Sequence, residues 1–354
     1  MRYYFVLTFL IIAGQLLGQS NKEKALTKGN EAIKLMDSGQ IAESIKLLEE
    51  SMKLDPDNID YPYEIGYANY MAKDYQKAID VLTPLTKRKD ANDRVYQLLG
   101  NSYDNIGQRD KSIETYEAGL KKSPKSGKLH LELGGMYLHT KEYDKAIDYY
   151  EKGIDAEPGF SSNYYRLAKI FLNSEEEVWG MIYGEIFMNL ERNSSRTAEI
   201  SKMLYDTYKS EIKFTSDTSF TVSFSKNAAI NLNFKKIELP FGVGVYEPTV
   251  MMEILSEKQI DINSLDRIRT GFIKNYFNNN RDKKYPNALF DYQNRILKEG
   301  HLESYNHWIL MKGDEDGFNE WQEVNTEKWD QFVNWFNPNG LKLDNKNKFI
   351  RTQY

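Results

Sequence analysis

Residues 93–126 read DRVYQLLGNSYDNIGQRDKSIETYEAGLKKSPKS, and residues 127–160 continue with GKLHLELGGMYLHTKEYDKAIDYYEKGIDAEPGF. Aligned without a gap, the two stretches place Gly100 above Gly134 and Pro124 above Pro158, each pair 34 residues apart. Such self-similarity at a fixed period is the signature of a repeat architecture. The two stretches are therefore two copies of one structural unit.

The same spacing extends beyond these two copies in both directions. Residues at matching positions form three series: Gly66, Gly100, Gly134 and Ala168, with Ala32 one repeat earlier; Ser44, Ala78, Ser112, Ala146 and Gly180; and Pro56, Pro124 and Pro158. Small residues let two helices cross closely, while proline ends a helix. Gly39 and Gly107 suit a tight turn between the two helices of a repeat. A pair of helices cannot bury its own apolar face, so such units stack.

On these residues the segment resembles the tetratricopeptide-repeat family, whose members are α-solenoids that mostly bind peptides or proteins in a concave groove. The repeats are expected at 25–58, 59–92, 93–126, 127–160 and 161–194, and 195–212 resembles the family's closing helix. Five repeats exceed the three or so that a stable stack needs. We predict a mainly α protein with a solenoid over 25–212, followed by a small α+β domain over 213–354.

The resemblance implies that the first helix of each repeat faces the partner, which we expect to be a protein or peptide. Carried over residue by residue, this side presents Tyr63, Tyr67, Tyr70, Arg94, Gln97, Asn101, Asn105, Lys128, Leu131, His139, Tyr165 and Lys169. Tyrosine offers a rigid apolar ring with a polar tip, and asparagine can pair with peptide groups. The alternative is that these are ordinary exposed helix residues, or that a loop of the same chain covers them.

The second helix of the fifth repeat, Val178–Leu190, departs from the repeat pattern. Apolar residues lie on nearly all of its sides, so one face of a solenoid cannot cover it. We expect the C-terminal region to pack onto this helix, with Gly180 and Gly184 permitting a close approach.

The periodicity changes after Phe214. Two runs alternate apolar with polar residues and predict a β-hairpin with its turn at Ser225–Ala228; their apolar residues are Phe220, Val222 and Phe224, then Ile230, Leu232 and Phe234. Three helices are predicted to follow, at Ser264–Phe277, Asn287–Lys312 and Thr326–Phe336.

Candidate chemical sites in this region are weak. Glu303 and His307 lie four residues apart, as in an acid–base pair or half of a metal site, but a surface pair is the commoner arrangement. Residues 314–317, Asp-Glu-Asp-Gly, lack the ligand spacing of a calcium loop and predict an acidic turn. No catalytic motif stands out, so we expect a protein that is not an enzyme and needs no cofactor or metal. An enzyme with an unfamiliar C-terminal domain remains an alternative.

Late tryptophans suggest a second alternative, a module that binds envelope glycans. Four of the five tryptophans occur late in the chain: Trp308, Trp321, Trp329 and Trp335. Core packing is the commoner role for such residues. Trp329 lies on the apolar stripe of its predicted helix, whereas Trp335 falls off it.

The start of the chain resembles an export signal. Arg2 precedes an apolar run that ends near Leu17, and small residues follow at Gly18 and Ser20. We expect residues 1–20 to be a cleaved signal peptide, with cleavage after Ser20 or after Gly18, leaving no membrane span and a periplasmic or secreted protein. The alternative is an uncleaved signal anchor, for which the apolar run is short. A net charge of −5 and a pI near 5.6 argue against nucleic-acid binding. The chain has no cysteine, so disulfides and lipid attachment at a cysteine are excluded. The oligomeric state cannot be read from the sequence.

Overall fold

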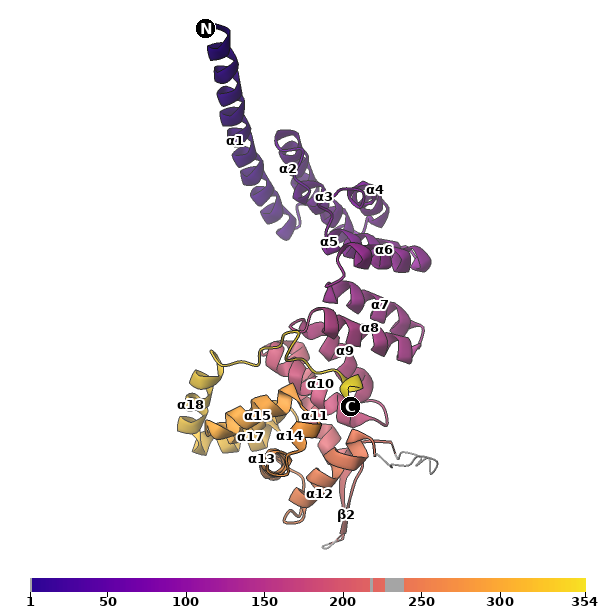
Figure 1. Ribbon diagram of the computed structural model, residues 1–354, viewed down its shortest axis with the longest axis vertical. Helices are drawn as coiled ribbons and strands as arrows, with labels where there is room; N and C mark the ends of the chain where they lie inside the picture. The colour runs from indigo at the N-terminus through magenta and orange to yellow at the C-terminus, as the bar shows by residue number, and fades with distance from the viewer. Residues whose placement is uncertain (1, 217–218, 227–238) are drawn as a thin grey trace. The chain divides into compact units, whose positions relative to one another are not determined.

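The computed structural model describes residues 2–216, 219–226 and 239–354, with the backbone alone at residues 2–19. The described residues are mainly helical, as predicted, and include one small sheet (Figure 1). It divides into two compact parts, residues 1–146 and 147–354, called here the N-terminal and C-terminal parts. The predicted domain boundary after residue 212 stays a prediction.

The N-terminal part is built from successive helices that pack in pairs (Figure 1). The helices are α1 (Arg2–Asp37), α2 (Ile41–Leu54), α3 (Asp60–Met71), α4 (Tyr75–Leu85), α5 (Asp93–Asn105), α6 (Arg109–Lys122) and α7 (Gly127–His139), and α8 (Tyr143–Ala156) begins here. The pairs α1/α2, α3/α4 and α5/α6 match the first three predicted repeats. Over the described residues, none of the helices combines the length and apolar character of a membrane span.

The turn within each of the first four repeats has a left-handed backbone at one position. Gly39 and Gly107 have φ angles of 83° and 75°, while Lys73 and Lys141 occupy the matching positions with φ angles of 62° and 61°. Glycine enters this region without steric cost, whereas other residues do so rarely. The predicted glycine turns are therefore confirmed, and the geometry of the turn persists where lysine replaces glycine.

Small residues lie where the two helices of a repeat cross. A Cβ atom added at Gly100 would lie 2.2 Å from Cε1 of Tyr116, and one added at Gly66 would lie 2.7 Å from Cγ of Leu82. Both of these larger side chains are fully buried. The periodic small residues therefore make room for a bulky residue of the paired helix.

The C-terminal part contains the rest of α8 and the remaining elements. These are α9 (Ser161–Phe171), α10 (Glu177–Leu190), α11 (Ser195–Glu211), β1 (Ile212–Ser216), β2 (Ser219–Val222), a π-helix η1 (Gly242–Tyr246), α12 (Glu247–Ile254), α13 (Ile262–Asn278), α14 (Arg281–Lys284), α15 (Ala288–Lys298), α16 (Leu302–Leu310), α17 (Glu315–Val324), α18 (Thr326–Phe336) and a 3₁₀ turn η2 (Arg351–Gln353). The predicted helices at 264–277 and 326–336 are confirmed as α13 and α18.

Two other predictions for this region are corrected. The single helix predicted over 287–312 is two helices, α15 and α16, because the chain turns at Gly300 with a φ angle of 81°. The acidic run that begins at Asp314 starts a helix instead of forming a bare turn. The Asp314 side chain accepts a hydrogen bond from the backbone N–H of Gly317, which caps α17.

The predicted first strand of the hairpin is observed as β2, and it pairs with a strand, β1, that the sequence did not predict. β1 follows α11 directly and pairs antiparallel with β2, with Ile212 opposite Val222 and Phe214 opposite Phe220. The predicted partner run around Ile230, Leu232 and Phe234 lies outside the described residues.

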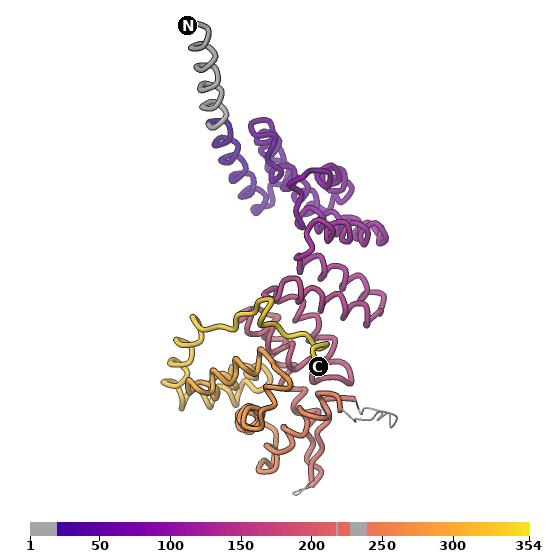
Figure 2. Tube along the Cα trace, in the orientation of Figure 1, coloured from indigo at the N-terminus to yellow at the C-terminus, as the bar shows by residue number. Residues whose placement is uncertain are grey.

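Helix α10 is surrounded by the C-terminal part, as the sequence predicted. All of its residues from Val178 to Asn189 are buried. The Trp179 ring stacks on Phe241 and Tyr354, with centroids 5.7 and 6.0 Å away, and Tyr183 meets Phe349 edge-on at 5.2 Å. Figure 2 shows the yellow end of the chain returning to this region. Residues far apart in the sequence thus enclose one helix.

Candidate partner-binding surface

A hollow of about 390 Å³ lies in the N-terminal part between the third and fourth repeats. It is called here the central hollow. Four of its lining residues belong to the predicted groove, namely Tyr70, Asn101, Asn105 and His139. The other five are Asp104, Tyr116, Glu132, Gly135 and Met136. Helices α3, α5, α6 and α7 all contribute to it.

Hydrogen bonds hold the polar side chains of this hollow in place. The Asn105 amide donates to the Tyr70 hydroxyl at 3.2 Å and to the Asn101 carbonyl oxygen at 2.8 Å. The Tyr116 hydroxyl donates to the Asn101 side-chain oxygen. Burial raises the pKa of Tyr116 far above its usual range, so this hydroxyl keeps its proton. The hollow therefore presents amides and phenols whose orientation is already fixed.

Two carboxylates also line the hollow. Glu132 accepts a hydrogen bond from the Gln97 amide at 2.8 Å, and Asp104 is exposed on α5. Burial raises the pKa of Tyr70, and Glu132 and Asp104 add to this rise through their negative charge. The negative charges of Glu132 and Asp104 therefore act on Tyr70, an aromatic residue in the lining of the hollow.

Gly135 leaves open space in the lining of the hollow. At 34-residue steps, Gly135 matches Ile33, Tyr67 and Asn101, each of which carries a side chain. A Cβ atom added at Gly135 would meet nothing within 4 Å. The sequence prediction omitted this glycine, although its position in the repeat register marked the place where a side chain is missing.

A second hollow of about 240 Å³ lies near the start of the repeats. It is lined by Leu26, Gly29, Asn30, Ile33, Leu48, Asn58, Asp60, Tyr61, Glu64 and Arg94. The Arg94 guanidinium pairs with Glu64 at 3.1 Å and lies 4.2 Å from the centroid of the Tyr63 ring. Tyr67 and Met71 lie exposed on the same helix, α3. The predicted residues Tyr63 and Arg94 therefore contact each other, whereas Lys128 and Leu131 line neither hollow.

Tyr165 and Lys169 do not form the open surface predicted for the fifth repeat. Tyr165 is only 8% exposed, and its hydroxyl donates to Glu199 on α11. Lys169 pairs with the same carboxylate at 2.7 Å. The prediction that Tyr165 faces a partner is corrected, because the closing helix covers this side of α9.

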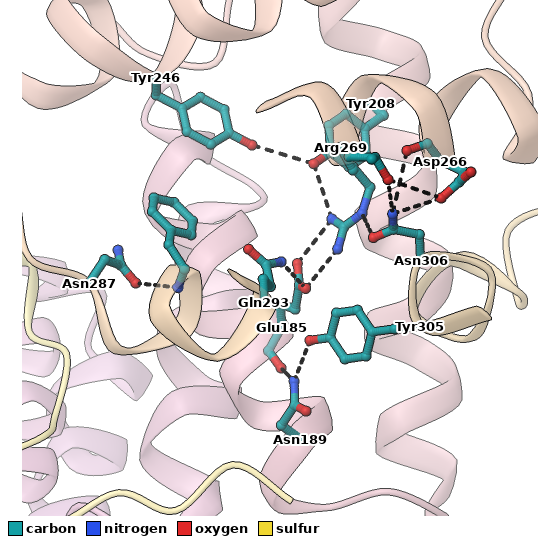
Figure 3. A network of polar contacts seen from close by, with 12 residues as sticks. Glu185, Asn189, Tyr208, Tyr246, Asp266, Arg269, Asn287, Gln293, Tyr305 and Asn306 are labelled. Carbon is teal, nitrogen blue, oxygen red and sulfur yellow. Dashed lines mark hydrogen bonds and ion pairs between the residues drawn. The ribbon is translucent and has the colours of Figure 1, made fainter. Parts of the chain in front are cut away.

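A buried polar network in the C-terminal part escaped the sequence analysis (Figure 3). Arg269 on α13 forms two hydrogen bonds with the Glu185 carboxylate on α10, at 2.7 and 3.0 Å. Gln293 donates to the same carboxylate, while Arg269 also donates to Asn306 at 2.9 Å and to Tyr208 at 3.2 Å. The charged and polar groups thus form hydrogen bonds with one another and link α11, α13, α15 and α16 to α10. We interpret the network as one that stabilises the fold.

Glu303 and His307 form neither the expected surface pair, because His307 is buried, nor the alternative acid–base pair. Nδ1 of His307 lies 2.8 Å from the backbone oxygen of Glu303, and its ring stacks on Trp321 with centroids 4.0 Å apart. The Glu303 carboxylate instead accepts from Trp321 and pairs with Lys328. Burial lowers the pKa of His307. Among the described residues, no group of three His, Asp or Glu side chains is arranged to hold a metal ion.

The late tryptophans do not form a flat exposed platform. Trp308 and Trp321 are buried. Trp335 is half-buried, with its ring 5.2 Å from that of His301 and 5.4 Å from the Arg295 guanidinium. These contacts fit the packing role that the sequence also allowed.

Glu177, at the start of α10, gives a pH-dependent prediction. Burial raises its pKa to about 7, and the negative charges of Glu211 and of the two glutamates that precede Glu177 add to the rise. Its folded-state pKa exceeds that of the unfolded chain, so stability decreases as the pH rises from about 4.5 to about 7. We expect Glu177→Gln to raise the free energy of unfolding by roughly 1 kcal/mol at pH 8, a modest gain because the site is part-exposed. At pH 4 we expect no change, because Glu177 is then protonated and uncharged like glutamine.

Urea unfolding at the two pH values measures this effect. Glu320→Gln is the control, since Glu320 is exposed on α17 and is not among the charges that raise the pKa of Glu177. Equal stabilisation by Glu177→Gln at pH 4 and pH 8 would contradict the assigned cause.

Comparison with family profiles agrees with the repeat geometry. Two family profiles described as tetratricopeptide repeat match residues 35–101 and 98–159. A thermophilic TPR protein in Thermus thermophilus has 15% identity and a TM-score of 0.43, covering 51% of this chain and 98% of its own. MamA from Desulfovibrio magneticus has 20% identity and a TM-score of 0.38, covering 49% and 97%. A search of curated proteins gives no match.

Proposed function

We propose that this chain, whose residues 35–159 are tetratricopeptide repeats, is a non-enzymatic scaffold that holds a protein or peptide in the central hollow. Proteins built from such repeats bind proteins or peptides. The central hollow carries the proposal, because it combines concave shape with fixed amide and phenol groups. Groups that are oriented before binding lose less entropy when a ligand arrives.

The proposal places the protein outside the cytoplasm. Residues 1–20 have the charged start, apolar run and small residues of a signal peptide. A periplasmic or a secreted scaffold both fit this signal. Comparing the N-terminus of the protein purified from its native cells with that of the encoded chain tests cleavage. An N-terminus at Met1 in mature protein would overturn the export proposal.

Filling the central hollow should abolish partner binding without unfolding the protein. Gly135→Tyr introduces the residue that Tyr67 provides at the matching position of the second repeat, into space that is open. We expect at least a tenfold loss of affinity, equivalent to about 1.4 kcal/mol, since the added ring occupies the ligand's volume. The measurement is capture of partners from an envelope extract, identified by mass spectrometry, followed by titration of the captured partner.

Glu117→Tyr is the matched control. It adds the same side chain at an exposed position of α6 that does not line the hollow. Loss of capture with Gly135→Tyr and retention with Glu117→Tyr support the proposal, provided that both variants keep the wild-type helical signal. Equal capture by all three proteins would place binding elsewhere.

A further inference from the structure

The charge of the central hollow is one-sided. Its described lining contains two carboxylates, Asp104 and Glu132, and includes neither lysine nor arginine. His139 lies exposed, at the end of α7. Both carboxylates extend their field to Tyr70 and Tyr116, whose pKa values burial already raises. An anionic group entering the hollow would be repelled, while a cationic group would be attracted.

The walls suit a long side chain with a charged tip. The half-buried ring of Tyr70 supplies aromatic surface, and Met136 adds a flexible apolar lining. Lysine and arginine bury their methylene stems along such surfaces while the charged end reaches a polar partner. Aromatic faces also attract these cations. A volume of about 390 Å³ accommodates either side chain.

The amides of α5 can hold the backbone of the same ligand. The Tyr116 hydroxyl binds the side-chain oxygen of Asn101, which fixes how the rest of this amide points. Asn105 is held in turn by Tyr70 and by the α5 backbone. These bonds use both N–H groups of the Asn105 amide and the side-chain oxygen of Asn101. The Asn101 amide nitrogen as a donor and the Asn105 side-chain oxygen as an acceptor therefore offer backbone contacts beside a pocket for one side chain.

We propose that the partner's docking segment inserts a lysine or arginine side chain into the central hollow, between Asp104 and Glu132. This inference rests on the proposed function and adds the chemistry of the ligand. The attraction between a basic residue of the peptide and the two carboxylates determines which peptide binds. The concave shape and the asparagines would bind any extended peptide.

Binding of the purified protein to an array of random twelve-residue peptides tests the inference. We expect the retained peptides to share a basic residue at one position. Replacing that residue by glutamine should weaken binding about tenfold, and by glutamate further still. Binding should also weaken between 50 and 500 mM salt, since ions screen exposed charge pairs over about 10 Å at 0.1 M.

Charge variants of the protein complete the test. The double variant Asp104→Asn, Glu132→Gln keeps the shape of the hollow and should remove the preference for basic peptides. Glu117→Gln removes one exposed carboxylate of α6 outside the hollow and should leave the preference intact.

The outcomes separate this inference from the proposed function. Peptides that are retained by the wild type and lost with Gly135→Tyr, yet show no basic preference, overturn the inference and leave the scaffold proposal standing. A basic preference that survives the double variant also overturns it. Failure of the wild type to retain any peptide overturns both proposals.

Discussion

Replacing Arg269 by methionine is expected to lower the free energy of unfolding by about 3–5 kcal/mol. The side chains of Arg269 and Glu185 are only 7% and 5% exposed, and they bind each other through two hydrogen bonds (Figure 3). Methionine fills a similar volume but leaves the Glu185 carboxylate buried without its cation. A buried charge that loses its partner keeps the full cost of leaving water.

Urea unfolding at pH 7 measures this loss, and an exposed ion pair provides the control. Lys328→Met removes the partner of Glu303 from a pair at the surface, so we expect a change below about 1 kcal/mol. The double variant Arg269→Met, Glu185→Leu should recover much of the stability, since no isolated charge remains. A loss below about 1 kcal/mol for Arg269→Met would mean that water reaches Glu185.

Gly100→Ala is expected to lower the free energy of unfolding by about 1–3 kcal/mol. The new methyl group would lie 2.2 Å from Cε1 of Tyr116, and that ring is fully buried at the crossing of α5 and α6. The crossing must open or the ring must leave its place. In an exposed helix the same substitution would favour folding, so the expected loss reports the close contact.

Gly135→Ala supplies that comparison within the same repeat array. Its added methyl group meets nothing within 4 Å, so we expect stability to rise by about 0.5–1 kcal/mol through helix propensity alone. Hydrogen exchange of the α5 and α6 amides measures the first variant, and exchange of the α7 amides measures the second. Equal changes in stability for Gly100→Ala and Gly135→Ala would show that the crossing at Gly100 can accommodate a methyl group.

The repeats could be predicted because their information is local and recurrent. A small residue every 34 positions identifies each helix crossing, and the prolines mark where repeats end. The predicted helix boundaries were wrong at Gly300, because the apolar pattern continues on both sides and suggested a single helix. There a left-handed turn, which only the structure reveals, interrupts the pattern.

The central hollow was predicted only in part. Asn101 and Asn105 follow from the family resemblance, because they lie on the first helix of a repeat. Tyr116 belongs to a second helix and reaches the hollow through the gap that Gly100 leaves, so no rule about first helices would include it.

Long-range pairs were beyond a single sequence. Glu185 and Arg269 are 84 residues apart, and nothing periodic links them. Tyr165 was misplaced for a related reason, since the repeat register fixes its face on α9 but does not show that Glu199 covers it. Partners of this kind depend on how the chain folds back on itself.

The end of the chain makes folding depend on the order of synthesis. In the N-terminal part each helix pair packs on its neighbours in the sequence, so the stack can assemble once about three repeats have been made. Helix α10 is made well before Phe349 and Tyr354, which enclose its aromatic residues only when the rest of the C-terminal part has followed. Until those residues are present, α10, whose residues from Val178 to Asn189 are all buried in the folded protein, keeps part of its apolar surface exposed.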